Sequence, residues 1–273
     1  MVKVMKRNSL TLLLAAAGML LAGVQTAKAQ KQGSTAERKV KVVLHMTGNQ
    51  KAEYDVSQLD SITFEGDDLI IEEEHEWVDL GLPSGTLWAT CNVGANSPEE
   101  YGDYFAWGET EPKAYYSLST YKFCEGTYNT NTKYCTKEGN GIVDNKLELE
   151  PIDDVATNKW GSGWQVPSKE QFKELIKTDN CVVHMTTQAG VEGWLITSKS
   201  NNNSIFLPAT GYFEGSNLYY LNKYGCYWSR SLNTNSCDNA HNLLLHPSVQ
   251  SSESYHERYL GQPVRPVRVQ RGL

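Results

Sequence analysis

The sequence lacks the short motifs by which many enzymes and metal sites are recognised. Gly-x-Ser-x-Gly, His-Glu-x-x-His and Cys-x-x-Cys do not occur in it. Six histidines are present, but the pair His241 and His246 is five residues apart on a predicted strand, so the two side chains should point to opposite faces. These absences predict no catalytic residues, no metal site and no cofactor.

Positive charge is also scarce. The chain has 25 Lys and Arg against 32 Asp and Glu, a formal net charge of −7. Residues 1–29 hold four of the basic residues and none of the acidic ones, so a chain beginning at Gln30 carries 21 basic and 32 acidic residues, a net charge of −11. Such a chain lacks the basic surface of a nucleic-acid-binding protein, so no nucleic-acid partner is predicted.

Long apolar runs are absent beyond the N-terminus. A basic segment at residues 3–7 precedes an apolar stretch at residues 10–24, and Ala27-Lys28-Ala29 fits a small-x-small cleavage site. The apolar stretch is too short to cross a bilayer comfortably, which favours a signal peptide over a membrane anchor. We therefore predict a signal peptide at 1–29, no membrane span, and export to the periplasm, the cell surface or the medium.

Six cysteines in an exported chain indicate disulfides before metal ligands or nucleophiles. Two local pairings would each close a short polar loop and stabilise the fold by about 3 kcal/mol in the loop-entropy model. A mixture of formed pairs and buried thiols is the alternative. The predicted pairs are Cys124 with Cys135 and Cys226 with Cys237, and the remaining two, Cys91 and Cys181, pair or stay as thiols.

Aromatic residues and glycine-bearing turns are concentrated at residues 76–109, which hold three tryptophans and a Tyr-Gly-Asp-Tyr-Phe run. Related motifs follow at residues 161–167 (GSGWQVP), 225–231 (GCYWSRS) and 261–269 (GQPVRPVRV). Trp and Tyr are large and need a polar partner when they are buried. Their density predicts an irregular core packed with aromatic rings.

These four segments, in this order, resemble the Fibrobacter succinogenes major paralogous domain, a family of secreted and surface proteins related to the C-type lectin-like fold. The resemblance covers roughly residues 76–268. It implies a lectin-like α+β domain at 76–270 in a Bacteroidetes-type surface setting, and it implies no common activity.

Two known activities of lectin-like folds fit this chain poorly. Calcium-dependent lectins use Glu-Pro-Asn or Gln-Pro-Asp, and the nearest matches, Glu111-Pro112-Lys113 and Gln262-Pro263-Val264, lack the last oxygen ligand. Formylglycine-generating enzymes use a closely spaced cysteine pair, whereas Cys226 and Cys237 are eleven residues apart and flank a Tyr-Trp-Ser strand.

The rest of the chain suggests a small appendage and one larger domain. Residues 38–72 are rich in β-branched residues and predict a small β module, which is too short to hold a core alone. In the main domain, Ser168 and Gln171 form a capping-box pattern that predicts one main helix among several short antiparallel strands. Residues 111–154 form an insertion that is either functional or a covered surface excursion.

The binding face is predicted at the loop 211–224 and the turn 233–238, on either side of a strand at 226–229. Both are rich in Tyr, Asn and Ser, the mixture of rigid and adaptable residues that binding loops favour. The alternative is that half of these aromatic residues belong to the core. The candidate residues are Tyr212, Tyr219, Tyr220, Asn222, Lys223, Asn233, Asn235 and Asp238.

These observations predict an exported, non-catalytic binding or adhesion protein with an extracellular glycan or protein as its ligand. A tyrosine ring can stack on a sugar face or fill a protein pocket, and Asn or Lys adds directed hydrogen bonds. The alternatives are a structural subunit of a cell-surface assembly and, less favoured, a formylglycine-generating-type enzyme.

Overall fold

The computed structural model describes residues 75–248 and 251–269, together with the backbone of four short strands nearer the N-terminus. The chain divides into two units, residues 1–71 and residues 72–273. The predicted signal peptide lies outside the described residues apart from the backbone of Val2–Lys3, and the predicted β module is described only at its strands.

The first unit contains two antiparallel pairs. β1 (Val2–Lys3) pairs with β4 (Thr63–Phe64), and β2 (Lys41–Met46) pairs with β3 (Gln50–Asp55). The β2–β3 register runs over six residue pairs, and β2 contains the β-branched residues Val42 and Val43, which favour extended backbone.

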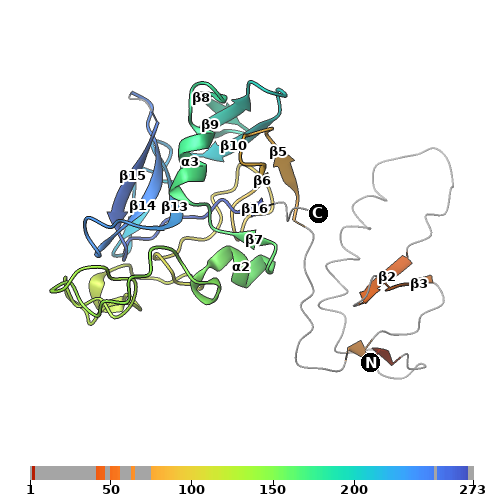
Figure 1. The fold of residues 1–273 in the computed structure, drawn as a ribbon. Coiled ribbons are helices and arrows are strands. Elements are labelled where there is room, and N and C mark those ends of the chain that lie inside the picture. The colour runs from red at the N-terminus through yellow and green to blue at the C-terminus, as the bar shows by residue number, and fades with distance from the viewer. Residues whose placement is uncertain are drawn as a thin grey trace. The chain divides into compact units, whose positions relative to one another are not determined.

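The second unit is built from short antiparallel strands in four sheets, drawn in Figure 1. The sheet orders are β5-β6-β16-β7, β10-β9-β8, β11-β12 and β13-β14-β15. The strands are β5 (Trp77–Asp79), β6 (Thr86–Ala89), β7 (Trp164–Gln165), β8 (Cys181–Gln188), β9 (Val191–Ser198), β10 (Ser204–Pro208), β11 (Tyr212–Glu214), β12 (Asn217–Tyr219), β13 (Gly225–Leu232), β14 (Asn239–Leu245), β15 (Ser252–Glu257) and β16 (Val267–Val269). The helices are η2 (Leu118–Thr120), η3 (Pro151–Asp153), α2 (Val155–Trp160) and α3 (Lys169–Leu175).

The predicted α+β class with one main helix is wrong. Strand accounts for 35% of the structure and helix for 10%, so the fold is β-rich. The predicted capping box is present, because Ser168 Oγ accepts from the Gln171 N–H at 3.2 Å and Gln171 Oε1 accepts from the Ser168 N–H at 2.8 Å. However, α3 has only seven residues. The Asn180 amide donates to the Glu174 carbonyl at 2.9 Å and closes the helix end. A capping box fixes where a helix starts but says nothing of how far it continues.

Two buried clusters hold the second unit together. One lies around α3, whose Phe172 and Leu175 are fully buried and pack with Trp88. The other is aromatic and includes Trp107, Trp160 and Trp228. Figure 1 shows α3 between the β8–β9–β10 sheet and the β13–β14–β15 sheet, and α3 contacts all three strands of the latter.

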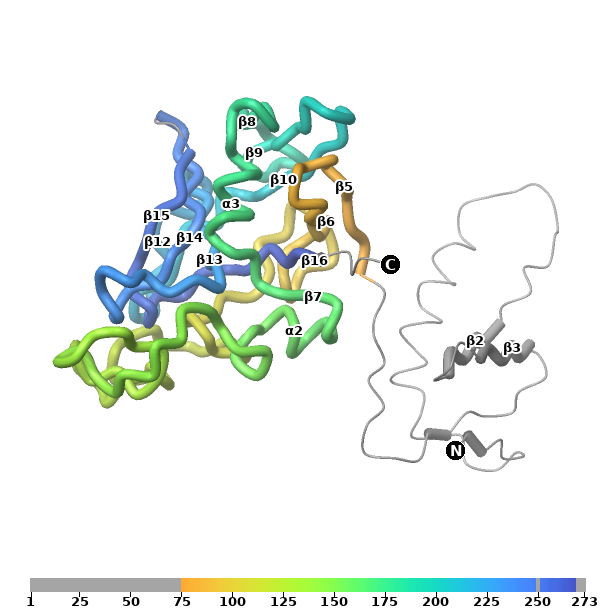
Figure 2. Tube along the Cα trace, viewed as in Figure 1, coloured from red at the N-terminus to blue at the C-terminus, as the bar shows by residue number. Residues whose placement is uncertain are grey.

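The insertion, residues 111–154, has little regular structure but is tightly held. In Figure 2 it is the yellow-green tube at the foot of the β13–β14–β15 sheet. Its side chains Tyr116, Tyr121, Phe123 and Tyr134 are all buried in the aromatic cluster. It is therefore largely a covered excursion that completes the core.

Arg258 cross-links several segments of this region through hydrogen bonds, and its side chain is 1% exposed. Its guanidinium donates to Tyr121 Oη at 2.9 Å, to Asn131 Oδ1 at 3.0 Å, to the Lys133 carbonyl at 3.0 Å and to the Cys237 carbonyl at 2.8 Å. These acceptors are all neutral. The guanidinium group is therefore surrounded by carbonyl and hydroxyl dipoles and not by a carboxylate. One side chain thereby joins the insertion to the turn after β13.

Candidate functional site

Four tyrosines of the predicted binding loop lie ring to ring, and we call Tyr212, Tyr219, Tyr220 and Tyr224 the tyrosine strip. The Tyr212 ring centroid lies 5.9 Å from that of Tyr219 and 6.0 Å from that of Tyr220. Tyr220 stacks on Tyr224 at 4.5 Å, with 17° between the ring planes. Tyr219 and Tyr220 are 41% and 45% exposed. The structure thus brings three predicted site residues together and leaves two of them open to solvent.

A tight backbone crossing fixes the strip. Tyr212 on β11 and Tyr219 on β12 face each other in the antiparallel register. The chain then turns through Tyr220, which has a φ of 57°, and passes over Gly211, which has a φ of 59°. A Cβ at Gly211 would lie 2.0 Å from the Tyr219 carbonyl oxygen and 2.7 Å from the Leu221 nitrogen. Only glycine fits such a crossing, so Gly211 sets the positions of the rings.

Polar groups lie at the same turn. Asn222 is exposed, and its Oδ1 accepts from Tyr101 Oη at 2.6 Å. The backbone N–H of Asn222 donates to the Ala209 carbonyl at 2.8 Å, and that of Lys223 donates to the Tyr220 carbonyl at 3.0 Å. The exposed Asn222 amide and Lys223 ammonium therefore stand on a turn that is held at both ends, beside the rings.

The strip itself is an uncharged aromatic surface. At one end Tyr212 meets His256, with ring centroids 5.0 Å apart. Burial raises the pKa of Tyr212 to about 12, and neighbouring Tyr220 and Glu214 add to the shift. Burial also lowers the pKa of His256 below its ordinary value. Both rings are consequently neutral at neutral pH, so this end offers apolar faces and hydrogen bonds rather than charge.

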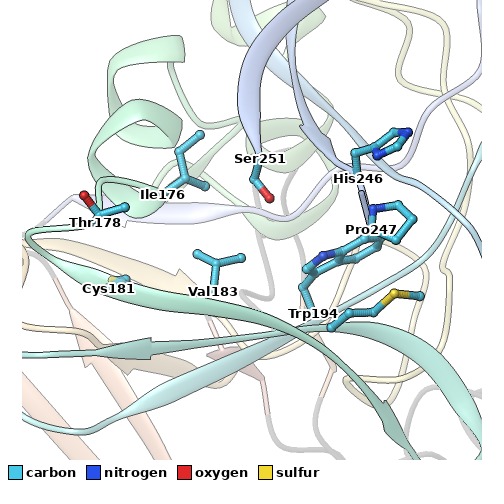
Figure 3. Close-up of a pocket in the computed structure, with 9 residues that line it drawn as sticks. Ile176, Thr178, Cys181, Val183, Trp194, His246, Pro247 and Ser251 are labelled. Carbon is cyan, nitrogen blue, oxygen red and sulfur yellow. The ribbon is translucent and has the colours of Figure 1, made fainter. Parts of the chain in front are cut away.

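A pocket of about 230 Å³ opens near the other end of the strip (Figure 3). Its floor is formed by Cys181 and Val183 on β8 and by Trp194 on β9, while Ile176 and His246 stand above them. Burial raises the pKa of the Cys181 thiol to about 11, and nearby Glu174 contributes. The thiol is therefore protonated and unreactive at neutral pH, and the floor is mainly apolar.

His246 connects the tyrosine strip to this pocket. Its ring lies 4.5 Å from that of Tyr224, with 34° between the planes, and it also lines the pocket. Tyr224 in turn stacks on Tyr220, whose ring is 6.5 Å from that of Tyr219. A series of ring contacts thus leads from exposed Tyr219 to the pocket mouth.

The second part of the predicted site, the turn 233–238, is built into the protein. Asn233 is 3% exposed, and its Oδ1 accepts from the Asn235 N–H at 2.9 Å. Asp238 Oδ1 accepts from Asn131 Nδ2 at 2.9 Å, and the Asn235 carbonyl accepts from Lys137 Nζ at 2.6 Å. The Asp238 carboxylate and the Asn235 carbonyl join the turn to the insertion, and Asn233 holds the turn itself, so these contacts support structure; the Asn235 side chain is exposed.

The structure does not unite the two parts of the predicted site. Tyr224 immediately precedes β13 and Asn233 immediately follows it. An eight-residue strand spans roughly 25 Å at about 3.3 Å per residue. Only the loop 211–224 therefore remains a candidate binding surface.

No S–S bond joins any of the described cysteines in this structure, the two predicted local pairs included. Cys226 lies near the start of β13 and Cys237 lies beyond its end, a separation too long for a disulfide, whose Cα atoms must approach within about 7 Å. The Cys124 thiol donates to the Leu118 carbonyl at 3.1 Å. Cys135 instead contacts Cys237, with the two sulfur atoms 2.9 Å apart.

The two remaining cysteines, for which pairing and buried thiols were both left open, lie in different clusters. Cys91 packs against the aromatic cluster, whereas Cys181 belongs to the cluster around α3. The structure thus gives these two cysteines different surroundings, which matches the buried-thiol alternative for Cys181.

Over residues 75–248 and 251–269, no group of three His, Cys, Asp or Glu side chains is arranged to hold a metal ion. No helix in the same part of the chain is long and apolar enough to cross a membrane. Comparison of the whole chain with protein-family models, curated proteins and solved structures gives no match.

Sequence reasoning missed the pocket. Neither Trp194 nor His246 belongs to a motif that indicates a cavity. The pocket forms where β8, β9, the end of α3 and the end of β14 meet. The lining residues from Ile176 to Trp194 are close in sequence, but His246 lies 52 residues after Trp194, so no local pattern predicts the pocket. The one local signal was the aromatic content of the loop 211–224 that leads to it.

Proposed function

We propose that this protein is an exported, non-catalytic binding protein that holds an extracellular glycan on the tyrosine strip. The observation that carries the proposal is the pair of exposed rings, Tyr219 and Tyr220, on a turn whose backbone is held in place. We also propose that the chain belongs to the family that the four aromatic motifs resemble. The α+β class that this resemblance implied is not part of the proposal, because the fold is β-rich.

The chemistry of the strip suits a sugar. A pyranose presents a face of C–H groups that packs on an aromatic ring and an edge of hydroxyls that need hydrogen-bond partners. Tyr219 and Tyr220 offer such faces, and Asn222 and Lys223 lie on the same turn. Because Tyr220 is already stacked on Tyr224, little rotamer freedom is lost when a ligand arrives.

The neighbouring pocket extends the proposal. Its position beyond His246 would let one residue of an oligosaccharide lie on the rings while another enters the cavity above Trp194. Cys226 gives no support to the enzyme alternative, because burial raises the pKa of its thiol to about 12 and keeps it protonated.

A glycan array probed with the full chain tests this function, followed by titration calorimetry on the strongest hit. The Tyr219→Ala/Tyr220→Ala double variant should bind at least about tenfold more weakly, because each lost ring removes on the order of 1 kcal/mol beyond its buried area.

The matched control is the Tyr128→Ala/Tyr255→Ala double variant, which removes two rings that are 50% and 57% exposed outside the strip. It should bind as the wild type does. Equal binding by both double variants, with intact near-ultraviolet circular dichroism, would place the ligand elsewhere. An array without any glycan hit would leave a protein ligand as the better reading of the strip.

A further inference from the structure

We propose that Cys135 and Cys237 form a disulfide that joins the insertion to the turn after β13. The two sulfur atoms are 2.9 Å apart, and both residues are fully buried. Of the described cysteines, these are the two whose thiols touch. The proposal does not depend on the ligand of the tyrosine strip.

The two segments are held against each other without help from sulfur. Arg258 donates to the Cys237 carbonyl at 2.8 Å and, more weakly, to the Tyr134 carbonyl at 3.3 Å, so it bridges the two backbones next to the thiols. Lys137 Nζ also reaches the Asn235 carbonyl across the same junction. The thiols are thus brought together by the fold, and closing the bond requires only a local adjustment.

Hydrogen bonds also fix the backbone conformation on the Cys135 side of the contact. Asp144 accepts hydrogen bonds from the Tyr134 and Cys135 N–H groups at 2.9 and 3.0 Å. Tyr134 has a φ of 58°, a left-handed conformation that a bulky residue adopts only where its surroundings require it. This kink directs the next residue, Cys135, toward the turn that carries Cys237.

The two thiols have unequal surroundings in the closed structure. The Cys135 thiol donates to Cys237 Sγ, and the Thr136 N–H donates to the same sulfur at 3.2 Å. These donors favour a thiolate at Cys237. Burial, reinforced by its hydrogen bond to Cys237, raises the pKa of Cys135 to about 11. The contact between the two sulfur atoms is therefore part of the closed fold, and it survives oxidation as the S–S bond.

The oxidant is a disulfide-bearing protein or small molecule, R–S–S–R. One of the two cysteines, as its thiolate, attacks one sulfur of the oxidant, forms a mixed disulfide and releases one thiolate R–S⁻. The other cysteine then loses its proton, attacks the protein sulfur of the mixed disulfide and expels the second R–S⁻. In sum, two protein thiols and one R–S–S–R give one protein disulfide and two R–SH. Because both cysteines are buried, the exchange takes place while the insertion is open, during folding.

Peptide mapping after trypsin digestion can detect the Cys135–Cys237 disulfide directly. Cleavage after Lys122, Lys133, Lys137, Lys223 and Arg230 puts Cys124, Cys135, Cys226 and Cys237 on four different peptides. The full chain is refolded with a mixture of reduced and oxidised glutathione, its remaining thiols are alkylated in denaturant, and the digest is analysed without reduction. The expected product is residues 134–137 linked to residues 231–258.

The same sample gives a second readout. A bond across 102 residues of sequence should make the melting temperature about 10 °C higher in the oxidised than in the reduced protein. The Cys237→Ser variant should lose this dependence on reductant, whereas the matched Cys124→Ser variant should keep it. Because the peptide map uses the wild type, it decides the question even if a variant fails to fold.

Three outcomes would overturn the proposal. They are a link from residues 134–137 to the Cys124 or Cys226 peptide, mixed glutathione adducts on the 134–137 and 231–258 peptides without a link between them, and complete alkylation of both thiols after refolding.

Discussion

The insertion at residues 111–154 and the loop at residues 211–224 are both rich in tyrosine, with five and four residues, yet the insertion buries three of its tyrosines in the core and the loop buries none fully. In the insertion, Tyr121 and Tyr134 are buried at 5% and 0% exposure. In the loop, Tyr219 and Tyr220 remain 41% and 45% exposed. Composition alone therefore does not separate a covered excursion from a binding surface.

The difference lies in the partners available to the hydroxyl groups. Buried tyrosine needs a hydrogen bond for its hydroxyl. Tyr134 Oη donates to Asp153 Oδ2 at 2.7 Å, and Tyr121 Oη accepts from Arg258 and donates to the Trp107 carbonyl at 2.8 Å. The exposed tyrosines of the loop can leave their hydroxyls to water. Arg258 and Asp153 thus supply the buried hydroxyl partners of Tyr121 and Tyr134.

The largest effect should come from removing the arginine. Arg258→Met keeps much of the side-chain volume but leaves the Asn131, Lys133 and Cys237 oxygens without their donor, so it should destabilise the protein by about 4 kcal/mol. Denaturant unfolding measures this loss, and native-state trypsin cleavage within the insertion should accelerate.

The matched control for Arg258 is Lys122→Met. Lys122 also ties the insertion, through Asp153 at 2.9 Å, but its side chain is 52% exposed, so its loss should cost about 0.5 kcal/mol. Equal stability of the two variants would show that Arg258 is not what closes the insertion.

Some parts of this architecture could be predicted from the sequence because they depend on residues that are close together in the chain. The capping box at Ser168 depends on a residue three positions later, and it is present. The aromatic density also predicted a core of large rings with polar partners, and Trp107 and Trp228 are such residues, each donating from Nε1 to a backbone carbonyl. By contrast, nothing near Arg258 in the sequence indicates that all but one of its acceptors lie 124 to 137 residues earlier, so its role is visible only in the structure.

The candidate site was half predictable for the same reason. Tyr212, Tyr219 and Tyr220 are close in sequence and meet across a short hairpin. The turn with Asn233 and Asn235 was expected beside them because both segments flank one strand. The length of β13 separates them, and the segment on which the turn rests is the insertion, which the sequence does not place.

The next largest effect concerns the loop. Gly211→Ala would place a Cβ 2.0 Å from the Tyr219 carbonyl in a left-handed backbone, so we expect a loss of about 3 kcal/mol and disordering of the strip. Gly190→Ala is the matched control, because Gly190 has a φ of +85° but nothing within 4 Å, and it should cost about 1 kcal/mol. A Gly211→Ala protein as stable as the control, with unchanged tyrosine fluorescence, would show that the loop can shift to accommodate the methyl group.

A third experiment tests the contribution of Asp153 by measuring how the free energy of unfolding depends on pH. Burial opposes ionisation of Asp153, but hydrogen bonds from Lys133, Tyr134 and Lys122 outweigh it, so its pKa lies below the ordinary value of 3.8. Its stabilising contribution is therefore complete above the unfolded pKa and is lost as the pH falls through the folded pKa. Asp153→Asn should cost about 2 kcal/mol near neutral pH, and less as the pH falls below about 4.

The neighbouring Asp154 provides the contrasting titration. Burial raises its pKa above 3.8 despite hydrogen bonds from the Thr157 and Val166 N–H groups, so the native protein binds that proton more tightly than the unfolded chain does. The stability gap between the wild type and Asp154→Asn should consequently widen on acidification, while the gap for Asp153→Asn narrows. Chemical denaturation at several pH values measures both, and gaps that move together would contradict the assignment.

The smallest effect compares one hydroxyl in each region. Tyr134→Phe removes a buried group that donates to Asp153 and accepts from the Glu150 N–H at 3.0 Å, so it should cost about 1 kcal/mol. Tyr220→Phe removes an exposed hydroxyl and should change the free energy of unfolding by less than about 0.5 kcal/mol. It also keeps the ring, so a glycan bound by stacking should remain bound. Thermal and denaturant unfolding of the two variants side by side give the comparison. If Tyr220→Phe proved the more costly, its hydroxyl would have to be part of the fold, and the loop would then resemble the insertion rather than a surface kept free for a ligand.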